Sequence, residues 1–199
     1  MLTLHVAENS PEAAVLVDGA SVAAVGSFDD LAAAHPAARV RRWPGILTPG
    51  LLNPYGPELL EATYHPDPRE ADSLGTEPIG GERARAIFGT DPSRLGASAR
   101  RGVQRLLAHG TVAVAGELRA RPVVDAVRRA GLAVGQRPPR LPGPPSLSPT
   151  PLILLPLLTQ ATSARFAIFD VPTRQDLVHR GASTCVATVV GGRLVYRAR

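Results

Sequence analysis

The chain has 199 residues, of which 44% are hydrophobic, so it is long enough to bury one or two hydrophobic cores. Its formal net charge is +5 and its pI is about 10.5, and all 22 basic residues are arginine. The arginines are scattered, only 4% of the residues are aromatic, and no nucleic-acid-binding motif is present, so nucleic-acid binding is the least favoured function.

The single cysteine, Cys185, excludes an intramolecular disulfide and a cysteine-based zinc site. It lies in a strand-like run, where we expect it to pack as a small apolar residue. The start of the chain lacks the pattern of a signal peptide. The most apolar segment, "PLILLPLL", is too short for a membrane span, which takes about 20 residues. We therefore expect a soluble cytoplasmic protein.

The N-terminal part predicts a small β unit. Residues 13–25 read as a β-hairpin, since valines flank Asp18-Gly19, a pair suited to a tight turn. Ser27 then has the character of an N-cap and opens a short helix that ends before Pro36. The alternating stretch at 38–48 predicts one or two more strands.

The middle of the chain predicts a loop followed by an α/β unit. Residues 62–90 are rich in Pro, Gly and charge, and we interpret them as a loop with little regular structure. Asp91 caps a helix that runs to His109, and "TVAVAG" follows as a short buried strand. Pro122 opens a second helix, which Gly131 ends, and "GLAVG" predicts one more strand. Helices alternating with strands are typical of parallel α/β folds.

A Pro-rich segment separates this unit from the C-terminal part. Residues 136–163 include seven prolines between Pro138 and Pro151, which exclude a helix or a central strand and predict a semi-extended linker. After it, "ARFAIFD" predicts a strand and "TRQDLVHRG" a turn or short helix. "STCVATVVGGRLVYRAR" predicts a hairpin that turns at Gly191-Gly192.

Three pieces of the chain together resemble amidohydrolase-superfamily enzymes, most of all imidazolonepropionase-like ones. They are "VLVDGASVAAVGSFDDLAAAHP" with "PGILTPGLLN", "GVQRLLAHGTVAVAG", and "ARFAIFDVP" with "CVATVVGGRLVYR". The resemblance implies an α+β protein in which residues 1–52 and 164–199 form one β-sandwich, the composite domain. Residues 53–135 would then be a loop plus a remnant α/β insert in place of the (β/α)₈ barrel, and residues 136–163 a linker.

The chain departs from that superfamily in ways that bear on activity. A barrel takes about 250 residues, and only residues 51–169 lie between the two halves of the expected sandwich, so we expect no closed barrel. Aligning Asn53 with the family pattern puts its His-x-His metal ligands on Tyr55 and Pro57, which are implausible zinc ligands. The bridging lysine that some members use cannot exist here. We therefore assign no catalytic, metal-binding or cofactor-binding residue.

The five histidines show no ligand spacing. His35 and His109 lie at predicted helix C-termini, where a partial positive charge is favourable. His65 lies near Glu61, Asp67 and Glu70 in the sequence. It is the best remaining candidate for a metal or acid–base site, although we favour a solvated loop there.

Two functions remain open. The favoured hypothesis is an amidohydrolase-like composite-domain pseudoenzyme. It would act by association with itself or with a protein partner, because a barrel remnant leaves apolar surface exposed. The alternative is a metal-dependent hydrolase of non-peptide carbon–nitrogen bonds, with a site rebuilt around His65 or completed in an oligomer.

Overall fold

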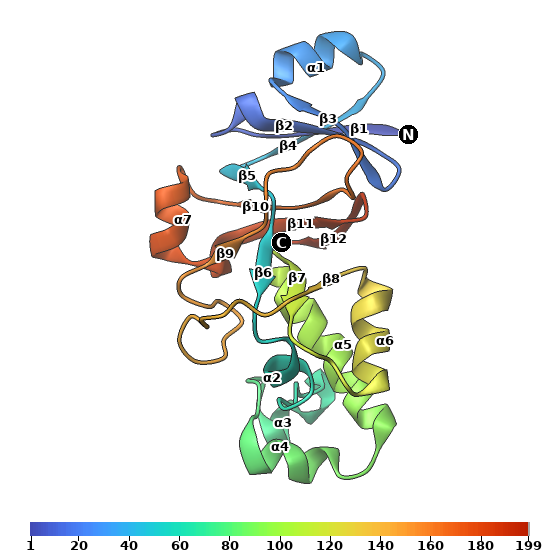
Figure 1. Ribbon diagram of the computed structural model, residues 1–199, viewed down its shortest axis with the longest axis vertical. Coiled ribbons are helices and arrows are strands. Elements are labelled where there is room, and N and C mark those ends of the chain that lie inside the picture. The colour runs from blue at the N-terminus through green and yellow to red at the C-terminus, as the bar shows by residue number, and fades with distance from the viewer. Residues whose placement is uncertain (199) are drawn as a thin grey trace.

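The computed structural model describes residues 1–198, which form a mixed α/β fold with three four-stranded sheets arranged one below another (Figure 1). The first sheet has the order β3-β2-β1-β4, and β1 and β4 are parallel. Ser27 caps the helix that covers this sheet by accepting a hydrogen bond from the Asp30 amide, as predicted. The elements are β1 (Leu2–Ala7), the 3-10 turn η1 (Pro11–Ala13), β2 (Ala14–Asp18), β3 (Ser21–Gly26), α1 (Phe28–Ala34) and β4 (Arg39–Trp43).

The second sheet combines both ends of the chain. Its order is β12-β11-β10-β5, and β5 pairs antiparallel with β10, with Leu47 opposite Ile168. The N- and C-terminal segments of the chain therefore meet in one sheet. The elements are β5 (Ile46–Thr48), β10 (Arg165–Phe169), α7 (Arg174–Arg180), η3 (Ala182–Thr184), β11 (Cys185–Val190) and β12 (Arg193–Arg197).

The first two sheets pack against each other through one buried cluster. Val15 and Trp43 enter it from the first sheet and Phe166 from the second. The turns of the β2–β3 and β11–β12 hairpins also touch. A Cβ on Gly192, whose φ is +70°, would lie only 1.9 Å from the Gly19 carbonyl oxygen, so this position requires glycine.

The third sheet has the order β8-β7-β6-β9, in which β6, β7 and β8 are parallel. The helices that connect the parallel strands begin and end as the sequence predicts. Asp91 caps α5, and Gly131 ends α6 in the left-handed conformation. Among residues 1–198 no sheet closes into a barrel, as expected. The elements are β6 (Leu51–Asn53), α5 (Pro92–Ala108), β7 (Thr111–Ala115), α6 (Arg121–Ala130), β8 (Ala133–Gly135) and β9 (Ile153–Leu154).

A second buried cluster joins the third sheet to the rest of the molecule. It contains Leu106 of α5, Val114 of β7, Val127 of α6 and Val190 of β11. The Thr188 hydroxyl of β11 also donates a hydrogen bond of 2.7 Å to the backbone carbonyl at the end of α5. The α/β unit therefore packs directly on the sheet formed by the two chain ends.

Two parts of the chain differ from the sequence-based expectation. The loop predicted for residues 62–90 is wrong, because short helices form there. Asp67 starts them with a capping box, and Tyr64, Ile79 and Ala84 form a small core beneath them. Strand β1 was not predicted at all. The additional helices are α2 (Gly56–Leu60), η2 (Pro68–Glu70), α3 (Ala71–Leu74) and α4 (Gly81–Phe88).

The Pro-rich segment crosses the third sheet and contributes β9 to its edge. Leu154 pairs with Leu51 of β6, and the two strands are antiparallel. An edge position tolerates the neighbouring prolines, because one side of an edge strand makes no ladder hydrogen bonds. Within the described part of the chain, no helix has the length and apolar character needed to cross a membrane.

Candidate functional site

The turn after β6 is the position where the resemblance places metal ligands. The Asn53 side chain is buried, its Oδ1 accepts a hydrogen bond from the Tyr55 amide at 3.0 Å, and its Nδ2 donates to the Ser146 carbonyl at 2.9 Å. The Tyr55 ring is also buried, and its hydroxyl donates to the Gly143 carbonyl. Both side chains therefore hold the Pro-rich segment over the carboxyl end of β6.

A glycine brings this turn close to the neighbouring strand. A Cβ on Gly56 would lie 2.8 Å from the carbonyl oxygen of Ala115, the last residue of β7. Glycine at this position therefore allows α2 to begin directly against the end of β7.

Helix α2 and the residues at the carboxyl ends of β7 and β8 line a cavity of about 670 Å³ with charged walls. Ligands of parallel α/β sheets commonly bind at this edge. Here Arg137 pairs with Glu58 at 2.8 Å, and Arg119 pairs with Glu117 at 3.0 Å. Glu61 accepts hydrogen bonds of 2.7 Å from two backbone amides just before α6. The charges are thus already paired within the protein. Sequence reasoning missed this group, although most of its residues follow directly after the parallel strands.

His65 is fully buried against α5, so the favoured solvated loop is wrong. Its Nε2 lies 2.7 Å from the Leu59 carbonyl and donates to it, which leaves Nδ1 as an acceptor with no partner among residues 1–198. Burial lowers the pKa of His65 and outweighs the hydrogen bond to Leu59, which raises it. The positive charges of Arg105 and Arg101 lower the pKa further. The imidazole is therefore neutral near pH 7.

The acidic residues near His65 in the sequence do not converge on its ring. Asp67 pairs with Arg101 at 3.2 Å, and Glu70 accepts a hydrogen bond of 2.5 Å from the Tyr64 hydroxyl. Glu61 binds the backbone before α6. Over residues 1–198, no three side chains of the types His, Cys, Asp and Glu lie close enough together to hold a metal ion.

The remaining histidines and the cysteine have structural surroundings. His35 and His109 occupy the C-caps of α1 and α5, as predicted. His5 is buried in the packed sheets and accepts a hydrogen bond from the Trp43 indole at 3.2 Å. Cys185 is buried in β11, as expected, and burial raises the pKa of its thiol to about 11.

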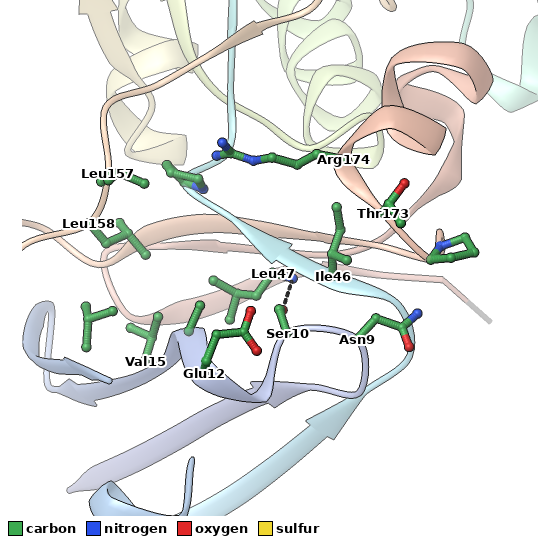
Figure 2. Close-up of a pocket in the computed structure, with 14 residues that line it drawn as sticks. Asn9, Ser10, Glu12, Val15, Ile46, Leu47, Leu157, Leu158, Thr173 and Arg174 are labelled. Atoms are coloured by element: carbon green, nitrogen blue, oxygen red, sulfur yellow. Dashed lines mark hydrogen bonds between the residues drawn. The ribbon is translucent and has the colours of Figure 1, made fainter. Parts of the chain in front are cut away.

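A second cavity, of about 590 Å³, opens where the first two sheets separate, and we call it the inter-sheet cavity (Figure 2). Its walls are mainly apolar and come from β2, β5 and the segment before β10, with Val15, Leu47 and Leu157 among them. Glu12 from η1 and Arg174 from α7 line it from opposite sides (Figure 2). No sequence motif pointed to this cavity, because its walls come from segments far apart in the chain.

Residues 13–38 match the family model of the imidazolonepropionase-like composite domain of bacteria. The predicted resemblance is confirmed over this stretch, which covers the β2–β3 hairpin and α1. No curated protein sequence matches the chain.

Several solved structures match parts of the chain at low identity. Guanine deaminase from Bradyrhizobium japonicum is 17% identical over 61% of this chain, with a TM-score of 0.41. Ochratoxinase from A. niger is 19% identical over 68%, with a TM-score of 0.42. N-isopropylammelide isopropylaminohydrolase from Burkholderia multivorans is 20% identical over 67%, also with a TM-score of 0.42. The chain spans only 27%, 31% and 37% of these three structures, respectively, and nothing about activity follows from likeness at this level.

Proposed function

We propose that this protein is an amidohydrolase-like composite-domain protein that has no hydrolase activity and acts by self-association. The first two sheets would be the composite β-sandwich, and the third sheet with α5 and α6 would be the remnant of the barrel. The match over residues 13–38 and the pairing of β5 with β10 support this assignment.

The observation that carries the loss of activity is the Pro-rich segment over the end of β6. In the family pattern, this turn carries a metal-binding His-x-His pair. Here the Asn53 amide and the Tyr55 hydroxyl donate hydrogen bonds to the carbonyls of Ser146 and Gly143. With these hydrogen bonds made, the two side chains are not free to bind a metal ion at this turn.

The surface that favours self-association is the open edge of β8. This strand pairs with β7 on one side only, and Val134 on it is 58% exposed. Val124 of α6 lies exposed beside it, and both line an apolar groove of about 470 Å³. An unpaired strand can pair antiparallel with its own copy across a two-fold axis, which continues the sheet and covers the groove.

The test is the mass of the protein in solution, measured by light scattering over a range of concentrations. The wild-type chain should form dimers. Val134→Glu should weaken dimerisation about a hundredfold, because it buries a charge at the interface. Val178→Glu is the matched control, since Val178 is 56% exposed on α7, away from β8, and should leave the dimer unchanged. A wild-type monomer at all concentrations contradicts self-association.

A further inference from the structure

The inter-sheet cavity has the size and the wall chemistry of a small-molecule site. Such sites typically enclose about 300–1,000 Å³ and combine apolar walls with a few polar groups. The volume here is about 590 Å³, and the walls include Val15, Ile46, Leu47, Leu157 and Leu158. Leu157 is 75% exposed, so a bound apolar group would cover it.

Two opposite charges face this cavity without partners. Both residues are exposed to solvent, and among residues 1–198 neither forms an ion pair or a side-chain hydrogen bond. In Figure 2 the two side chains come from opposite sides, Glu12 from η1 and Arg174 from the start of α7. A ligand that carries two opposite charges, one at each end of an apolar body, would match both residues and the walls between them.

The elements that carry these charges are held in position. The Ser10 hydroxyl accepts a hydrogen bond from the Leu47 amide at 3.1 Å, which ties the start of η1 to β5. Thr173 caps α7 by accepting from the Asp176 amide at 3.1 Å, which fixes the first turn of the helix where Arg174 lies. The backbone positions from which the two charged side chains extend are therefore fixed before a ligand binds.

We propose that the inter-sheet cavity binds a short apolar peptide with free ends, whose ammonium group pairs with Glu12 and whose carboxylate pairs with Arg174. The apolar side chains of the peptide pack on the walls. This site is separate from the turn after β6 and does not depend on the function proposed above.

The test uses the full chain with leucyl-leucine and trileucine as probes, in NMR titrations of the backbone amides. The amides of Val15, Leu47 and Leu157 should shift, and saturation should give an affinity. The same titration is repeated with the N-acetylated peptides and with the C-terminal amides, each of which lacks one charge.

Two variants connect each charge of the peptide to one residue. Glu12→Gln should weaken binding of the free peptide about fivefold and leave the N-acetylated peptide unaffected. Arg174→Gln should do the same for the free peptide and leave the amide unaffected. All four side chains involved are exposed, so Glu8→Gln and Arg180→Gln serve as matched controls that keep wild-type affinity.

Three results would overturn the proposal. In the first, millimolar peptide shifts no amide that lines the cavity. In the second, the variants weaken binding of the free and the blocked peptides equally, which shows that the peptide charges do not pair with Glu12 and Arg174. In the third, the amides of the cavity shift with protein concentration alone, which assigns the cavity to a second copy of the chain.

Discussion

The buried His5 makes the packing of the first sheet against the second sensitive to acid. Its side chain is only 3% exposed, its Nδ1 accepts the Trp43 indole hydrogen bond, and the Phe166 ring meets it edge-on with centroids 5.0 Å apart. Burial lowers its pKa from 6.5 to about 4, and the charge of Arg41 contributes in the same direction. The folded protein therefore holds this imidazole neutral over a range in which the unfolded chain binds a proton.

The sign and size of the effect follow from this difference. Stability is greatest above pH 6.5 and falls as the pH drops toward 4, because only the unfolded chain takes up the proton in that window. The gap between a pKa of 6.5 and a pKa of about 4 corresponds to a loss of about 3 kcal/mol from His5 alone. Other groups also titrate in this range, so the contribution has to be isolated by substitution.

The assay is urea unfolding at pH 7.5 and pH 4.5, followed by the fluorescence of Trp43, the single tryptophan. Glutamine at position 5 keeps a hydrogen-bond acceptor and cannot be protonated, so His5→Gln should lose about 2.5 kcal/mol less than wild type between the two pH values. His179→Gln, which changes an exposed side chain, should follow wild type. Equal losses in wild type and His5→Gln would refute the reasoning.

Two further predictions concern the Pro-rich segment and the packing beneath α5. Tyr55→Phe removes the hydroxyl that holds the segment and should lower the free energy of its local opening by about 1 kcal/mol, which trypsin would detect as faster cleavage after Arg140. Tyr196→Phe is the control, because the Tyr196 hydroxyl makes no hydrogen bond among residues 1–198, and it should leave the cleavage rate unchanged. Equal rates for the two variants would contradict the role of Tyr55. Gly102→Ala places a Cβ 2.6 Å from the buried imidazole of His65 and should lower the free energy of unfolding in urea by about 1–3 kcal/mol. Gly26→Ala is the control, because its Cβ would meet nothing closer than 4.0 Å. Similar stability of both variants would show that the packing is looser than described.

Local signals in the sequence were sufficient for most of the elements. The Asp18-Gly19 turn, the Ser27 cap and the Gly131 stop each fix an element boundary by chemistry within a few residues, and the structure has these boundaries where expected. These features depend on neighbours in the chain, so they can be derived without knowledge of the fold.

The features that were missed depend on contacts between distant segments. His65 is buried because α5 lies over it, with the Ser98 hydroxyl 2.9 Å from its amide nitrogen and Gly102 leaving room for its ring. The composition of residues 62–90 gives no sign of this cover. The inter-sheet cavity likewise forms only because segments from opposite ends of the chain, which carry Glu12 and Arg174, line the same space.

The Asn53–Tyr55 turn shows both what the sequence can predict and what it cannot. Its residues alone led to the prediction that it holds no family-type metal site, since the resemblance places the ligand positions on Tyr55 and Pro57. That Asn53 and Tyr55 instead bind the Pro-rich segment, some 90 residues later, could be learned only from the structure.

The most direct test of the account is the metal content of the purified full chain after incubation with excess zinc and dialysis. The hydrogen bonds from Asn53 and Tyr55 to the Pro-rich segment predict that no stoichiometric zinc remains. One tightly held zinc ion per chain, lost on Asn53→Ala but kept in Asn9→Ala, would contradict it.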